Sequence, residues 1–126
     1  MLSVGAIGGV DRRFEDLDVY CRAGAFADEL WELVSSWPSF DRWTVGIQLV
    51  RSVDSIGANI AEAYGRSTDL DQRRFLYVAR GSVNETEHWL IRARCRRLIG
   101  SDHEHVAREI GRMLNGLIRS HRDRQA

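Results

Sequence analysis

The segment Arg51–Gly65, RSVDSIGANIAEAYG, constrains the fold of this chain most strongly. At about 100° per residue, apolar residues cover about 200° of the helix that it predicts, whereas a surface helix needs only about 100°. A single file of small polar residues follows another line of the same helix: Ser52, Ser55, Asn59 and Glu62. We therefore expect a central helix that neighbours surround on most sides.

This central helix, predicted from about Asp41 to Gly65, has two apolar stripes. The first consists of Leu49, Val53, Ile56, Ile60 and Ala63. The second consists of Trp43, Ile47, Val50, Gly57, Ala61 and Tyr64. Asp54 falls inside the second stripe, so it should have an arginine or hydroxyl partner if it is buried.

Three further helices are predicted, over Asp16–Ser35, Asp69–Ile99 and from Ser101 to about residue 120. Each carries a broad apolar arc at helical spacing. Trp31 belongs to the first of these arcs and Val78 to the second.

Local signals mark the ends of these helices. Trp37-Pro38 ends the first, because proline disfavours helical backbone at the residue before it. Gly100 should end the third in the usual role of a glycine beyond a helix. Ser101 and Glu104 then predict a capping box for the fourth helix.

The predicted fold class is therefore all-α, an up-down-up-down antiparallel four-helix bundle. Short connections between long helices favour antiparallel neighbours. We expect a flexible tail over residues 1–13, the bundle over 14–120 and a frayed tail over 121–126.

Composition excludes several function classes. The 126 residues balance 18 basic against 18 acidic side chains, and every basic residue is arginine, so no global field recruits nucleic acid or membrane. No apolar run approaches a membrane span of about 18 residues. We expect a cytoplasmic protein in which Cys21 and Cys95 are buried, reduced thiols.

The polar file of Ser52, Ser55, Asn59 and Glu62 allows more than one interpretation. It is either a solvated face or a contact between helices or subunits, in which hydrogen bonds set the register; a ligand site is the third alternative. We favour the contact and assign Glu85 to the same set.

No cluster defines a reaction. Glu85 and His88 have the Glu-x-x-His spacing of bundle metal sites, but that chemistry needs a second such pair and two more carboxylates. His103 and His105 should face water and lack partners at zinc-binding spacing. No serine lies in a Gly-x-Ser-x-Gly elbow. We expect no enzyme, no cofactor and no metal.

Arginines crowd the end of the third predicted helix: Arg92, Arg94, Arg96 and Arg97. Basic residues are favourable near a helix C-terminus, where acidic neighbours can pair with them. The rival interpretation is a phosphate-binding patch for RNA or DNA.

Several motifs resemble one bacterial family, the 23S rRNA-intervening sequence proteins. They occur in order along the chain: Phe14, Leu17, Val19 and Tyr20; Trp37-Pro38; Gln48, Leu49 and Arg51; Ser55, Ile56, Asn59, Ile60, Ala61, Glu62, Ala63, Gly65 and Arg66; and Phe75, Leu76, Ala79, Gly81, Ser82 and Glu85. The chain departs from the family pattern at Val50, Gly57 and Ala63.

This resemblance implies a four-helix bundle that forms homopentamers. The family is also similar to the accessory variability determinant of diversity-generating retroelements, which binds a reverse transcriptase and nucleic acid. We therefore expect a homo-oligomeric scaffold or adaptor with a protein partner. The alternative is a nucleic-acid-binding accessory protein that uses the arginine-rich end, with weak RNA or DNA binding.

Overall fold

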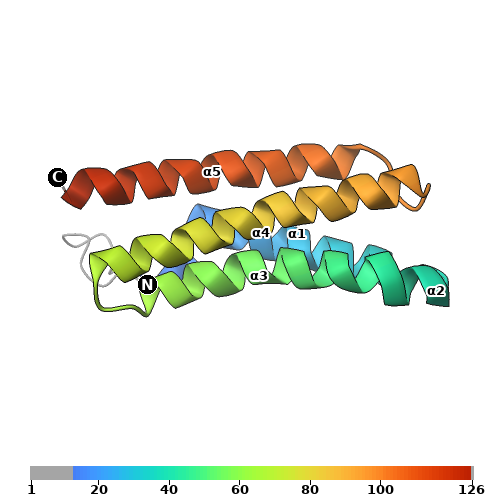
Figure 1. The fold of residues 1–126 in the computed structure, drawn as a ribbon, viewed down its shortest axis with the longest axis horizontal. Helices are drawn as coiled ribbons and strands as arrows, with labels where there is room; N and C mark the ends of the chain where they lie inside the picture. The colour runs from blue at the N-terminus through green and yellow to red at the C-terminus, as the bar shows by residue number, and fades with distance from the viewer. Residues whose placement is uncertain (1–12, 126) are drawn as a thin grey trace.

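The computed structural model describes residues 13–125 as a bundle of long helices (Figure 1). These are α1 (Asp18–Ser35), α3 (Ile47–Tyr64), α4 (Asp69–Cys95) and α5 (Asp102–Gln125). No strand occurs within the described residues. The predicted all-α four-helix bundle is confirmed.

Each long helix packs against the next one along the chain, and α1 also contacts α5, which closes the bundle (Figure 1). The core follows the bundle axis and draws on all four helices. Its largest fully buried apolar side chains are Phe26, Leu30, Leu49, Val53, Ile56, Ile60, Leu76, Leu90, Ile110 and Leu114.

The first helix begins close to its predicted start. A 3₁₀ turn, η2 (Phe14–Asp16), precedes α1. Helix α1 ends at Ser35, and the following Trp37 is buried against the core. Pro38 keeps Trp37 out of helical geometry, so the predicted stop is confirmed.

The central rod is longer than α3 alone. It begins with α2 (Ser39–Asp41), continues through a π-helical segment, η3 (Arg42–Gly46), and runs into α3. The sequence predicted one helix over this range but not the π turn. A Cβ on Gly46 would lie 2.8 Å from Val34 Cγ1, so α1 approaches the rod here more closely than a side chain would allow.

Helix α4 ends at Cys95, so the predicted end near Ile99 was wrong. Gly100 is not the terminating residue either. Arg97 takes that role, with a φ of 64° in the left-handed region. This conformation usually selects glycine or asparagine.

Two backbone hydrogen bonds close the end of α4. The Leu98 N–H donates to the Ala93 carbonyl at 2.9 Å, and the Arg97 N–H donates to the Arg94 carbonyl at 3.0 Å. This is the Schellman pattern. It satisfies two of the carbonyls that a helix end leaves unpaired.

Helix α5 begins at Asp102, directly after Ser101, as predicted. The Glu104 carboxylate, however, binds the Arg94 guanidinium, with Nε 2.5 Å from Oε2. The capping-box role predicted for that carboxylate was therefore wrong. The helix continues past residue 120 to Gln125, and His121 is buried. Of the flexible tail predicted over residues 1–13, residues 1–12 lie outside the described residues.

Candidate functional site

The two apolar stripes of the central rod have different surroundings. Every residue of the first stripe is buried in the core. In the second stripe Ile47, Val50, Gly57, Ala61 and Tyr64 are only half-buried, and Trp43 is 66% exposed. The three companion helices therefore cover the first stripe fully and the second, open stripe only in part.

Aromatic side chains gather at one end of this open stripe. Trp31, Phe40 and Trp43 are 57%, 78% and 66% exposed. Beside them a shallow pocket of about 220 Å³ is lined by Trp31, Arg42, Trp43, Ile47 and Val50. Trp31, which its spacing places on the apolar arc of the first helix, is therefore exposed. Such a concentration of exposed aromatic area is typical of interaction surfaces.

A second hollow, a notch of about 300 Å³ between α1 and α3, is lined by residues that include Asp28 and Asp54. The pocket and the notch together form the α1–α3 groove. Burial raises the pKa of the Asp54 carboxyl above its usual range, and the negative charge of Asp28 raises this pKa further. Neither carboxylate forms an ion pair within residues 13–125. Asp54 is only partly shielded and counts as exposed, so the condition under which an arginine or hydroxyl partner was expected does not apply.

The polar file divides into a buried part and an open part. Ser52 is 3% exposed and donates to the Leu49 carbonyl at 3.0 Å. Its hydroxyl also lies 3.1 Å from the hydroxyl of Thr86 on α4. Ser52 thus forms a contact between helices inside one subunit, a role that the sequence offered as one alternative.

The remaining polar residues bond to residues three or four positions away in the sequence. Ser55 donates to the Ser52 carbonyl at 2.7 Å, and Asn59 donates to the Ser55 carbonyl at 2.8 Å. Glu62 pairs with Arg66 at 2.6 Å. Glu85, which is exposed, accepts a long 3.5 Å bond from Trp89 Nε1. Whether a neighbouring subunit covers these residues stays a prediction.

In the predicted arginine cluster, one guanidinium group is paired with a carboxylate and others are exposed. Arg94 binds Glu104, and the Glu104 hydrogen bond raises the pKa of the Arg94 guanidinium. Arg92 is half-buried. Arg96 and Arg97 are exposed at the turn after α4 and have no acidic partner within residues 13–125.

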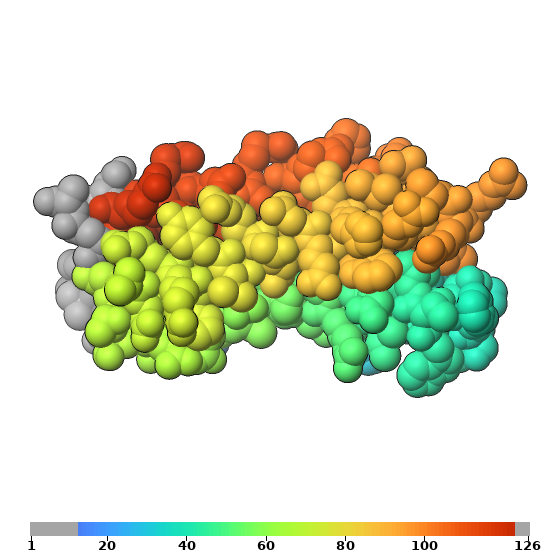
Figure 2. Space-filling model, viewed as in Figure 1, coloured from blue at the N-terminus to red at the C-terminus, as the bar shows by residue number. Residues whose placement is uncertain are grey.

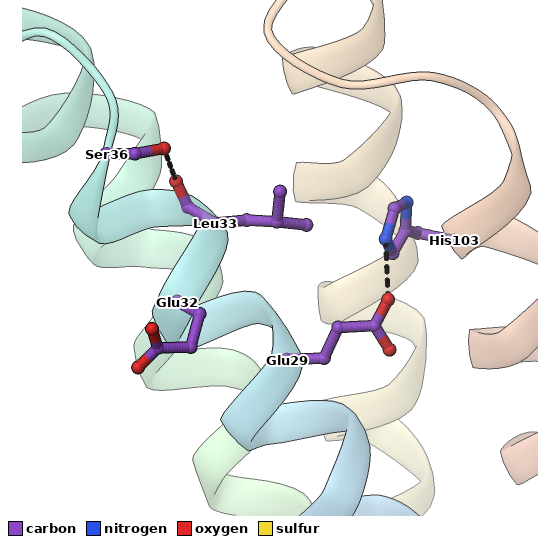
Figure 3. Close-up of a pocket in the computed structure, with 5 residues that line it drawn as sticks. All are labelled: Glu29, Glu32, Leu33, Ser36 and His103. Atoms are coloured by element: carbon purple, nitrogen blue, oxygen red, sulfur yellow. Dashed lines mark hydrogen bonds and ion pairs between the residues drawn. The ribbon is translucent and has the colours of Figure 1, made fainter.

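A third hollow, of about 530 Å³, lies near the start of α5 and is lined by Glu29, Glu32, Leu33, Ser36 and His103 (Figure 3). His103 Nε2 lies 3.1 Å from Glu29 Oε2, whereas the Ser36 hydroxyl donates to the Leu33 carbonyl at 2.7 Å. In Figure 3 the Glu32 carboxylate points away from the histidine, and the Ser36 hydroxyl points to the Leu33 carbonyl. The His103–Glu29 pair joins α1 to α5.

Other candidate sites remain isolated. His88 is exposed and packs edge-on against Trp89. Within residues 13–125, no three histidine, cysteine or acidic side chains come together to hold a metal ion. Cys21 and Cys95 are both exposed, so their predicted burial was wrong.

The family model described as "23S rRNA-intervening sequence protein" matches residues 15–116 of the chain. The chain belongs to this family. The match spans α1, the central rod and α4 and enters α5. No curated protein matches the chain. The resemblance stated from the sequence motifs is thus confirmed.

A solved structure of an S23 ribosomal protein family member from Bacteroides thetaiotaomicron, titled as a protein with unknown function, is similar to this 23S rRNA-intervening sequence protein. The two share 27% identity, and the TM-score is 0.74. The similarity covers 80% of this chain and 95% of the other. Across residues 13–125, no helix is both long and apolar enough to span a bilayer.

Proposed function

We propose that this protein is a non-enzymatic, homo-oligomeric scaffold that presents a repeated surface to a protein partner. The favoured assembly is a homopentamer, as the family resemblance implies. The observation that supports the proposal is the open second stripe of the central rod together with its exposed aromatic end, Trp31, Phe40 and Trp43. A clustered apolar surface of this kind usually marks a protein contact.

Light scattering on the purified full-length protein tests the assembly. At micromolar concentration we expect a single species with a mass several times that of the 14.4 kDa chain. A monomer mass under these conditions would contradict the proposal. Trp43→Ala should weaken the assembly, whereas Glu32→Ala, on the α1–α5 side, should not.

A second candidate function is nucleic-acid binding through the arginine-rich end of α4. Two charges, on Arg96 and Arg97, are exposed there and unpaired within the described residues. A ring of subunits would repeat these charges, so weak phosphate contacts would add together.

A salt-titrated binding assay with mixed RNA separates the two functions. Nucleic-acid binding predicts an affinity that falls steeply with salt and drops in an Arg96→Gln, Arg97→Gly variant. Glycine at 97 removes the charge but accepts the left-handed backbone. No binding at low salt removes this candidate and leaves the scaffold.

A further inference from the structure

We propose that the α1–α3 groove binds helix α4 of a second copy of this chain, with that α4 antiparallel to α3. This inference rests on the proposed homo-oligomer and names the surfaces that form it. The groove is defined by Asp28, Trp31, Arg42, Trp43, Val50 and Asp54.

The groove is one continuous surface. On the rod, Trp43, Ile47, Val50 and Asp54 recur every three or four residues, which places them on the same side. They line the two hollows between α1 and α3. Small residues deepen the acidic end, where Gly24 and Gly57 line the notch. A Cβ on Gly24 would meet no atom within 4 Å, so another helix can approach closely.

The other surface is a stripe on the outer side of α4, defined by Leu70, Arg74, Tyr77, Val78, Gly81 and Glu85. These residues also recur at helical spacing. Leu70, Tyr77 and Val78 are 71%, 38% and 46% exposed, although Val78 belongs to the predicted apolar arc of this helix. Helix α4 lies across the face viewed in Figure 2, whereas α1 lies behind it (Figure 1).

Two charged residues of the α4 stripe, Arg74 and Glu85, are exposed. The Arg74 side chain is 66% exposed, its contact with Asp71 is long, at 3.7 Å, and its guanidinium lies 5.1 Å from the centre of the Phe75 ring. Within residues 13–125, Glu85 holds only the long bond from Trp89. Both side chains can therefore turn toward a partner at little cost, since exposed pairs of this kind contribute little.

From the N-terminus to the C-terminus, charge and apolar character follow the same order on the rod and on α4. Along the rod, Arg42 comes first, then the apolar residues, then Asp54, which lies beside Asp28 in the notch. Along α4, Arg74 comes first, then Tyr77 and Val78, then Glu85.

The spacing of these charges also agrees. Asp54 and Arg42 are twelve positions apart, and Arg74 and Glu85 are eleven, so each pair spans about 17 Å of helix. An antiparallel α4 would place Arg74 against Asp54 and Glu85 against Arg42, with the apolar residues between. Complementary charges of this kind fix register and exclude other pairings.

The orientation agrees with cyclic symmetry. Within one subunit, α3 and α4 are antiparallel neighbours. Copies rotated about an axis parallel to the bundle keep their helix directions, so the α4 of one copy is antiparallel to the α3 of the next. Because the groove and the stripe are different surfaces, the contact is head-to-tail and closes into a ring when the rotation allows.

Charge reversal tests the pairing by light scattering on full-length protein. Asp54→Arg and Arg74→Asp should each raise the dissociation constant between subunits by more than about tenfold, because like charges then face each other. The double variant should restore assembly. Controls with the same charge changes away from both surfaces, Glu32→Arg and Arg112→Asp, should assemble like the wild type.

Each outcome decides between the two proposals. A monomeric wild type removes the scaffold and this inference together. An oligomeric wild type that tolerates both single reversals overturns only the interface. Single defects that the double variant does not repair also overturn it. If a reversal at 54 or 74 unfolds the chain, shown by circular dichroism, the pair Arg42→Glu and Glu85→Arg gives the same test at the other end.

Discussion

The α4–α5 side and the α1–α3 side of the bundle join their helices by different means. Polar pairs connect α4 to α5, including Arg108 with Glu87 at 2.9 Å and Arg80 with Asn115 at 3.2 Å. Between α1 and α3, no ion pair forms within the described residues. Small residues and two like charges, Asp28 and Asp54, line that side instead.

This difference indicates which side of the bundle has its charged side chains paired within a single chain. The charges between α4 and α5 have partners within the chain, so adding a second copy there gains little. The α1–α3 side leaves aromatic area exposed and its carboxylates without ion pairs within the described residues, and exposed aromatic area of this kind is typical of interaction surfaces.

The core should dominate the free energy of unfolding. Leu114 on α5 is fully buried, whereas Trp43 on the rod is 66% exposed. Leu114→Ala should therefore cost about 2–5 kcal/mol, measured by urea unfolding of the isolated chain. Trp43→Ala should change the same quantity by less than about 0.5 kcal/mol while it weakens assembly. A large loss of chain stability with Trp43→Ala would mean that the aromatic end belongs to the core.

Gly46→Ala should be the next most destabilising change. The new Cβ would lie 2.8 Å from Val34 Cγ1 and 3.1 Å from the Asp41 carbonyl oxygen. We expect a loss of about 1–3 kcal/mol from this overpacking, measured by urea unfolding. Gly116→Ala, where the Cβ meets only the Arg119 guanidinium at 3.9 Å, is the matched control and should not destabilise. An equal change in the free energy of unfolding at both sites would show that the π-helical segment shifts easily to accommodate the new methyl group.

Helical periodicity predicted the fold because it reports which residues share a side of a helix. It placed the first stripe on one side of the central helix, and every residue of that stripe is buried. The helix end predicted at Trp37-Pro38 is also confirmed. It could not separate a stripe that the same chain buries from one that it leaves open. Trp31 and Val78 belong to apolar arcs and are nevertheless exposed, because their chemistry suits a core and an interface equally well.

The ends of helices and the contacts of polar side chains were harder to predict, since they depend on partners that are distant in sequence. Arg97 closes α4 although glycine is the usual residue for its backbone conformation. Glu104 pairs with Arg94 rather than with the backbone of its own helix. Thr86 carried one available signal, a small polar residue on an apolar arc, and it contacts Ser52. The burial of His121, 2.9 Å from Gln72, had no local signal.

The buried polar contact between α3 and α4 should have a moderate effect. Thr86 is fully buried, and its hydroxyl lies 2.8 Å from the Ser82 carbonyl and 3.1 Å from Ser52. Thr86→Val keeps the shape but removes the donor, so we expect a loss of about 1 kcal/mol in urea unfolding. Ser55→Ala, which removes a half-buried bond within one helix, should cost less. A larger loss at Ser55 would show that this part of the polar file stabilises the single subunit.

The last substitution, Gly24→Ala, should change the stability of the chain and the association of subunits in opposite directions. Gly24→Ala should stabilise the isolated chain by about 0.5–1 kcal/mol, because the site is inside α1 and its Cβ meets no atom within 4 Å. The same methyl group would fill the acidic end of the α1–α3 groove and should weaken subunit association in light scattering. Gly116→Ala on α5 serves as the control: it should gain chain stability and leave association unchanged. If Gly24→Ala stabilises the chain without any loss of association, no helix approaches this part of the groove. The contrast between the two sides of the bundle would then lie in the aromatic end alone.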